Sequence, residues 1–301
     1  MIKRTLYFGN PAYLKTANEQ LVIEMHDGGE TKSAPIEDVG LLILDHQQIT
    51  ITQALLAKLL ANNTAIISCD DTHHPTGMML SLDGHTLQSQ KFQAQVDATV
   101  PLKKQLWQQT VAAKIENQAA MLAFRREENK LLLNLAASVK SGDSENHEAQ
   151  AAAYYWKRVF PDFLAFRRER YGPPPNNLLN YGYAILRALV ARSLVASGML
   201  PTLGIHHRNQ YNAYCLADDI MEPYRPYVDY VVYQIIRNNG QHLDMSPSMK
   251  KALLEIPAMD VMIDGKKSPL MNAVQRTTAS LAKCFEGTSR KILYPELKLN
   301  V

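Results

Sequence analysis

Three separate stretches of this chain contain residues whose types could do chemistry together. They are EAQAAAYYW beginning at Glu148, LGIHHRNQYN with the adjacent His206 and His207, and ADDIMEPYRP with Glu222 near its centre. Two carboxylates and an imidazole from separate segments can form a mixed oxygen and nitrogen site for a divalent metal. Such a site generally does phosphoester or hydrolytic chemistry. None of the stretches contains a common catalytic motif, so their combination carries the prediction.

Glu148 is expected in the first turn of a helix that begins near residue 145, with Ser144 as a candidate cap. On that helix Glu148, Ala152 and Tyr155 recur at i, i+4 and i+7, so the carboxylate shares a face with a small residue and an aromatic ring. The alternative is a solvated acid that is favoured by the helix dipole.

The histidines follow a loop, where one of two neighbours faces a site and the other faces away. In the acidic segment, either Asp218 or Asp219 can share a helical face with Glu222, and the sequence leaves open which of them does. Acids this close repel one another unless Arg225 or a metal neutralises them. The alternatives are packed or solvated histidines and an ordinary acidic helix start.

Basic residues gather beside aromatic residues in FRREENK, WKRVF and FRRERYG, an arrangement that suits phosphate contacts with stacking. The candidate DNA-binding residues in these segments are Arg167, Arg168 and Arg170. A charged helical face covered by water is the alternative. The sequence DGKKS at 264–268 lacks the first glycine of a phosphate loop, so that motif is rejected.

The composition is that of an ordinary globular protein of 301 residues, 46% hydrophobic and 20% charged. A net charge of +3 permits nucleic-acid binding without requiring it. Three widely spaced cysteines predict reduced thiols. The start of the chain shows no signal peptide, and arginines interrupt the most apolar stretch, so we expect a cytoplasmic protein with no membrane partner.

The order of the predicted elements indicates an α+β fold with two domains. Residues 1–88 contain short strands rich in branched apolar residues, bounded by turn residues, and one helix near 51–63. Residues 89–301 consist of good helix formers interrupted by polar or proline-rich breaks. We therefore expect a small β-rich N-terminal domain followed by a larger all-α catalytic domain.

These stretches, together with the helix NNLLNYGYAIL from Asn176, resemble the metal-dependent DNA integrase of CRISPR adaptation, the first of the two universal adaptation proteins. The resemblance runs along the whole chain. It implies that Glu148, His207 and Glu222 are the catalytic metal ligands, with Asp219 supporting them and Arg225 contacting phosphate. It implies Mg²⁺ or Mn²⁺ as cofactor, with one or two ions.

The resemblance also implies a function and partners. The enzyme would join the 3′-hydroxyl ends of short DNA fragments into repeat DNA by transesterification. It would bind double-stranded DNA, form a homodimer through the β-rich domain and assemble with the small second adaptation protein. GIHHRNQYN and the short chain favour the type II branch, whose RNA-guided effector nuclease is then a further expected partner. Two other functions stay open, a metal-dependent phosphohydrolase of nucleotides and a non-enzymatic helical scaffold that binds nucleic acid.

Overall fold

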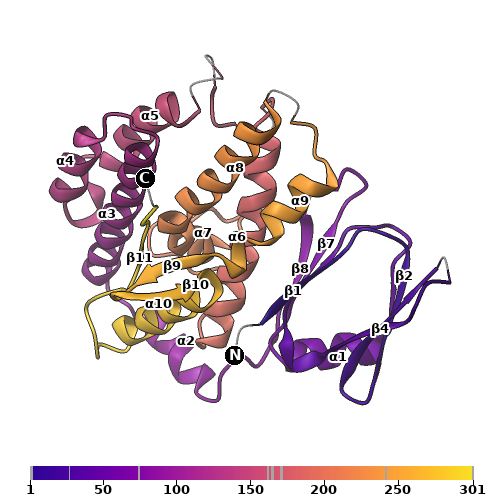
Figure 1. Cartoon of the computed structure of the whole chain (residues 1–301). Coiled ribbons are helices and arrows are strands. Elements are labelled where there is room, and N and C mark those ends of the chain that lie inside the picture. Colours follow the sequence, from indigo (N-terminus) through magenta and orange to yellow (C-terminus); the bar gives the residue numbers. More distant parts are fainter. Residues whose placement is uncertain are drawn as a thin grey trace. The chain divides into compact units, whose positions relative to one another are not determined.

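A computed structural model describes residues 3–26, 28–73, 75–160, 163, 166–169, 172–240 and 243–299. The chain divides into two compact units, Met1–Gln88 and Ser89–Val301 (Figure 1). Throughout the described ranges, no helix combines the length and apolar character needed to cross a bilayer. The three cysteines are buried.

The N-terminal unit is built from two four-stranded sheets and a helix. One sheet has the strand order β1-β5-β7-β8, in which β1, β5 and β7 are parallel and β8 is antiparallel to β7. The other has the order β4-β3-β2-β6. The elements are β1 (Arg4–Phe8), β2 (Ala12–Ala17), β3 (Gln20–Met25), β4 (Lys32–Pro35), β5 (Val39–Leu44), β6 (Thr50–Ile51), α1 (Gln53–Ala61), β7 (Ala65–Cys69) and β8 (Pro75–Met79).

One hydrophobic core joins these elements. Leu14 and Leu21 come from one sheet, Leu42 from the other and Leu55 from α1, and each is fully buried. Such burial is the main favourable term in folding. At the start of α1 the side chain of Thr52 accepts a hydrogen bond from the backbone N–H of Leu55, which fixes where the helix begins.

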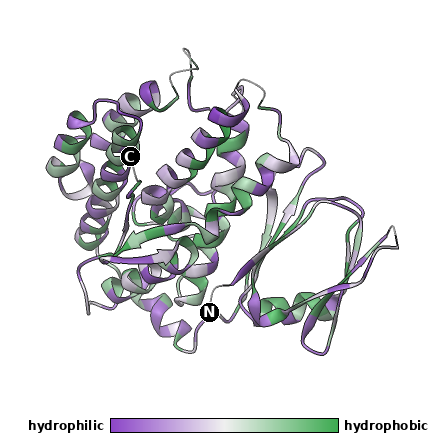
Figure 2. Ribbon diagram, in the orientation of Figure 1, coloured by the Kyte–Doolittle hydropathy of each residue, from purple (hydrophilic) through white to green (hydrophobic). Residues whose placement is uncertain are grey.

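The C-terminal unit is mainly helical. Its helices are α2 (Gln88–Val96), α3 (Val100–Phe124), α4 (Lys130–Ser138), α5 (His147–Val159), α6 (Asn176–Ala196), α7 (Cys215–Met221), α8 (Arg225–Asn239), α9 (Pro247–Leu254) and α10 (Leu270–Phe285). Helix α6 packs against α7, α8, α9 and α10. At Gly182 on α6 an added Cβ would lie 2.5 Å from a methyl group of Val228, so glycine allows α6 and α8 to approach closely. In Figure 2 hydrophilic and hydrophobic segments alternate along α3, a helix with one face in the core.

The prediction of an all-α C-terminal domain was wrong in one part. This unit also contains a three-stranded sheet in the order β10-β9-β11, made of β9 (Asp260–Ile263), β10 (Lys266–Pro269) and β11 (Pro295–Glu296). Asp264 and Gly265 join β9 to β10, and both have a positive φ. An Asp-Gly pair of this kind is the preferred turn of a two-residue hairpin. The fold is therefore mixed, with a β-rich N-terminal part and a largely helical C-terminal part.

Candidate metal centre

Glu148 lies in the first turn of α5, and an acid in the preceding loop positions it. Both carboxylate oxygens of Asp143 accept backbone hydrogen bonds, from His147 at 2.8 Å and from Glu148 at 3.0 Å. The prediction of Ser144 as the cap was wrong, because the residue before the helix, Asn146, adopts a left-handed conformation and Asp143 reaches across it. The Glu148 side chain is 23% exposed, so it is accessible from solvent.

Glu222 follows α7 directly, in a short 3₁₀ turn (Glu222–Tyr224), and is buried. Its two oxygens have different partners. Oε1 accepts a hydrogen bond from Nε of Arg225 at 2.7 Å, and Oε2 lies 2.5 Å from Nζ of Lys114. Burial by itself would raise the pKa of this carboxyl, but the positive charges of Arg225 and Lys114 outweigh burial and lower the pKa to about 2. Glu222 is therefore held ionised.

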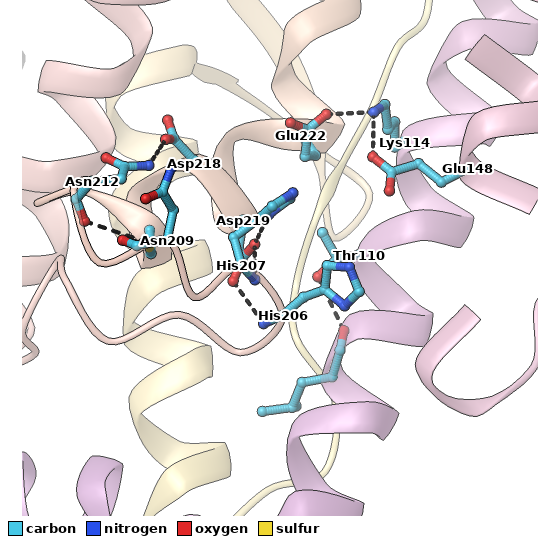
Figure 3. Close-up of polar contacts among 12 residues, drawn as sticks. Thr110, Lys114, Glu148, His206, His207, Asn209, Asn212, Asp218, Asp219 and Glu222 are labelled. Carbon is cyan, nitrogen blue, oxygen red and sulfur yellow. Dashed lines mark hydrogen bonds and ion pairs between the residues drawn. The ribbon is translucent and has the colours of Figure 1, made fainter. Parts of the chain in front are cut away.

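Lys114 joins the two carboxylates. Its Nζ donates a hydrogen bond to Oε1 of Glu148 at 2.7 Å while it pairs with Glu222, so both acids meet the same ammonium group (Figure 3). Burial disfavours the charged lysine, yet the negative charges of Glu222 and Glu148 prevail and raise its pKa. Two carboxylates from α5 and from the turn after α7 thus converge on one cation position.

Sequence reasoning missed Lys114, although a signal was present. Thr110, Lys114 and Asn117 recur at i, i+4 and i+7 on α3 and are all buried, so they form one polar stripe on a packed helix face. Polar residues in register with a buried helix face need partners, since an unpaired buried polar group is costly. The hydroxyl of Thr110 has such a partner, because it is hydrogen-bonded to the hydroxyl of Tyr294 at 2.8 Å.

Asn117 fixes the turn that carries Glu222. Its side-chain amide donates to the backbone oxygens of Pro223, at 2.8 Å, and Pro295, at 3.0 Å, while its oxygen accepts from the N–H of Leu297 at 2.9 Å. All three bonds are buried, so α3, the 3₁₀ turn and β11 are tied together at one residue. The backbone next to Glu222 is thereby held in place.

His207 is fastened to Asp219, which lies one helical turn before Glu222. Nδ1 of His207 is 2.5 Å from Oδ1 of Asp219, and the backbone N–H groups of His206 and His207 also donate to this carboxylate. Asp219 is fully buried. At Gly204 an added Cβ would lie 2.3 Å from the carbonyl oxygen of His207 and 2.8 Å from Oδ2 of Asp219, so glycine is required for the loop to fold onto this acid.

The two histidines have different surroundings. The ring of His206 stacks on Trp107, with centroids 4.2 Å apart and planes 2° from parallel. Burial and the neighbouring His207 lower the pKa of His206, whereas the hydrogen bond to Asp219 raises the pKa of His207. His206 is thus a packing residue, and His207 is held by an acid through one ring nitrogen.

The open question between the two aspartates has a structural answer. Asp218 faces away from His207 and pairs with Nε of Arg187 and the side-chain amide of Asn212, each at 2.7 Å. Asp219 is the acid that contacts His207 (Figure 3).

The predicted DNA-binding arginines differ in whether their guanidinium groups are bonded to other side chains of the protein. The guanidinium of Arg168 donates to the side-chain oxygens of Asn176 and Asn180 on α6, at 3.0 and 2.6 Å, so it is engaged within the protein. Arg225 is engaged with Glu222. Arg167 is exposed, and Arg170 lies outside the described residues.

Across the part of the chain that the structure describes, no three His, Cys, Asp or Glu side chains stand ready to hold a metal ion. The arrangement explains why, since the ammonium of Lys114 lies between Glu148 and Glu222, and Nδ1 of His207 is bonded to Asp219. The donor set nevertheless fits a divalent ion. Two carboxylates already meet at one cation position, and an imidazole is oriented by a carboxylate on its other nitrogen, as is usual for metal-binding histidines.

Known sequences resemble this chain along most of its length. A family model described as CRISPR associated protein Cas1 matches residues 6–263. The chain is 33% identical over 304 residues to the CRISPR-associated endonuclease Cas1 of Neisseria meningitidis serogroup C (strain 8013), and the match covers 99% of this chain and 97% of the relative. It is 25% identical over 287 residues to a Cas1 endonuclease of Pyrobaculum aerophilum, covering 91% and 96%.

Solved structures share the fold. A casposase bound to integration product superposes with a TM-score of 0.80 at 18% identity, covering 97% of this chain and 92% of the casposase. A Cas1 protein from Thermotoga maritima gives a TM-score of 0.75 at 16% identity, covering 94% and 97%. With a family model over most of its length and a full-length relative at 33% identity, the chain belongs to the CRISPR-associated Cas1 family.

Proposed function

We propose that this chain is a metal-dependent DNA integrase and endonuclease of CRISPR spacer acquisition. The observation that carries the proposal is the meeting of Glu148 and Glu222 at one cation position, Nζ of Lys114. Family membership supports the reaction, because the relative from Neisseria meningitidis is named an endonuclease of this family. A nucleotide phosphohydrolase would use the same metal-binding side chains, but the relatives are named as endonucleases and not as phosphohydrolases.

The proposed ligands of Mg²⁺ or Mn²⁺ are Glu148, His207 and Glu222. Hard divalent ions prefer carboxylate oxygens, and Mn²⁺ also accepts imidazole. Asp219 would keep the His207 ring in orientation through Nδ1 and so leave the other ring nitrogen for the ion. The proposal includes both a site with one bound ion and a site with two.

A bound ion would polarise the scissile phosphodiester and ease deprotonation of the attacking hydroxyl. The 3′-hydroxyl of a short DNA fragment attacks a phosphorus atom of repeat DNA. A new bond from the 3′-oxygen to phosphorus forms, and the old phosphorus–oxygen bond breaks and releases the repeat's own 3′-hydroxyl. The reaction exchanges one phosphodiester for another, so it needs neither an external energy source nor a side-chain nucleophile.

The protein's own residues would keep the site rigid during this exchange. Arg225 holds one oxygen of Glu222, and its guanidinium lies 4.6 Å from the ring centroid of Tyr183 on α6. Asn117 holds the backbone after Glu222, and Trp107 packs under the histidine loop. Fixed donors and charges of this kind lower a barrier because they need no reorganisation as charge develops.

Double-stranded DNA is the proposed substrate, and a neighbouring structure has a casposase bound to integration product. Arg167 is the exposed candidate for contact with the DNA backbone. Arg168 and Arg225 are the other described candidates, and both are bonded to side chains of the protein itself. A homodimer made through the N-terminal unit and assembly with the small second adaptation protein are proposed as well; a solved neighbour is a Cas6-RT-Cas1–Cas2 complex. Assignment to the type II branch, with its effector nuclease as a partner, rests on the sequence resemblance alone.

The test is a joining reaction. Purified protein and its small partner are mixed with Mn²⁺, a short duplex with free 3′-hydroxyl ends and a supercoiled plasmid bearing the repeat. We expect covalent insertion of the duplex and relaxation of the plasmid by the wild type. Duplexes with 3′-deoxy ends are the control and should not be joined. Binding of DNA without any joining would favour the scaffold, and release of phosphate from nucleotides without joining would favour the phosphohydrolase.

A further inference from the structure

Lys114 is a buried cation at the place where the proposed site needs a metal ion. Its side chain is 11% exposed, and its ammonium is 2.7 Å from Oε1 of Glu148 and 2.5 Å from Oε2 of Glu222 (Figure 3). Glu148 and Glu222 come from different elements, and in the described contacts this ammonium is what joins them. Without a positive charge between them, two carboxylates this close would repel strongly in a partly buried site.

The two cations around Glu222 are not equivalent. Arg225 is a planar group placed over Tyr183 and bonded to Oε1 of Glu222, so its position is fixed on two sides. Lys114 is a point charge on a flexible four-carbon stem. Its helix, α3, is anchored by Thr110 and Asn117, so the ammonium can withdraw by rotation of the stem while the backbone stays in place.

We propose that Lys114 is a built-in counter-cation that holds Glu148 and Glu222 together in the metal-free protein and competes with the divalent ion for them. Metal binding then exchanges one cation for another and displaces the ammonium from between the carboxylates. The competition lowers the affinity for the ion and keeps the empty site folded. This inference rests on the proposed function of the same site.

The test measures Mn²⁺ alone, by isothermal titration calorimetry and by the thermal transition with and without Mn²⁺. Lys114→Met removes the charge and keeps an unbranched chain of similar length. We expect Mn²⁺ to bind this variant at least about tenfold more tightly, because the competing charge is gone. We expect its melting temperature without metal to fall by several degrees. We also expect Mn²⁺ to raise the melting temperature of this variant by more than it raises that of the wild type.

Lys114→Arg should change the Mn²⁺ affinity in the opposite direction. It keeps the positive charge and introduces a planar guanidinium that can bond both oxygens of a carboxylate. We expect it to bind Mn²⁺ more weakly than the wild type. Lys104→Met is the matched control, since Lys104 is an exposed lysine on the same helix, and it should leave Mn²⁺ affinity unchanged. If Lys114→Met does not fold, the Mn²⁺ affinity of Lys114→Arg alone tests whether the side chain at position 114 competes with the metal ion.

Failure of this inference is distinguishable from failure of the proposed function. If Glu148→Gln abolishes Mn²⁺ binding while Lys114→Met binds it no more tightly than the wild type, or Lys114→Arg no more weakly, the metal site stands and the competition is refuted. If Glu148→Gln binds Mn²⁺ as tightly as the wild type, the proposed site itself is wrong.

Discussion

Two buried acids on successive helical segments, Glu222 and Asp229, have opposite environments. Glu222 is surrounded by positive charge, with Lys114 and Arg225 on its two oxygens, and its pKa is lowered to about 2. Asp229 on α8 accepts hydrogen bonds from neutral hydroxyls, those of Tyr155 at 2.8 Å and of Tyr183. Burial raises the pKa of Asp229 to about 6 despite these bonds.

The difference separates an ion site from a structural tie. An acid paired with cations can exchange one cation for another, whereas an acid held by tyrosine hydroxyls has no paired cation to exchange. Tyr155 lies on α5 with Glu148, and Tyr183 lies on α6 beneath Arg225. Asp229 therefore links the elements that carry the site without belonging to the chemistry.

The largest contrast is expected between the isosteric variants of the two acids. Glu222→Gln removes a ligand charge and should lower Mn²⁺ affinity and DNA joining by more than about 100-fold, beyond the usual effect of residues around a metal site. Asp229→Asn should keep joining at pH 7.5 within about tenfold of the wild type. Titration of Mn²⁺ and the joining assay measure both. Equal losses in the two variants would remove the distinction.

The next effect concerns the amide that holds the turn after Glu222. Asn117→Ala breaks three buried hydrogen bonds and should cost about 2–4 kcal/mol of unfolding free energy, measured by urea denaturation. It should also weaken Mn²⁺ binding, because Glu222 loses its support. Gln109→Ala is the control: Gln109 lies on the same helix and bonds to the backbone of Arg290 and Ile292. A metal defect of equal size in both variants would contradict a specific role for Asn117.

The environment of Asp229 predicts a pH dependence of stability. Its folded pKa, about 6, is above the ordinary value of 3.8, so the folded state binds the proton more tightly than the unfolded state does. The stability that this group contributes is complete below about pH 4 and is lost as pH rises through about 6, by at most about 3 kcal/mol. Relative to Asp229→Asn, the wild type should lose stability across that window, as measured by urea denaturation at each pH. Parallel curves would show that Asp229 is not the source.

The smallest effect is expected from the packing histidine. His206→Ala removes the stack on Trp107 and should cost about 1 kcal/mol, with Mn²⁺ affinity unchanged. His207→Ala should instead reduce Mn²⁺ affinity strongly. Chemical denaturation and Mn²⁺ titration of both variants separate the two roles. A reversed pattern would assign the metal to His206.

The sequence predicted some of these features and not others, for physical reasons. The β-rich start and the helical remainder follow from apolar periodicity and turn residues. The C-terminal hairpin was missed, although Asp264-Gly265 is a turn signal, because each of its two strands is only four residues long and shows little periodicity. Lys114 could not be placed near Glu148 and Glu222 from one sequence, since helix packing brings them together across long separations. On an isolated helix a lysine is typical of a solvated face.

The measurement that tests the central claim most directly is anomalous diffraction from crystals of this protein soaked with Mn²⁺. If Glu148, His207 and Glu222 together bind the ion, the anomalous map will contain a strong peak within coordinating distance of all three side chains, with Asp219 still bonded to His207. A peak at another group of residues, or no peak at a saturating Mn²⁺ concentration with Lys114 still between the two carboxylates, would contradict it.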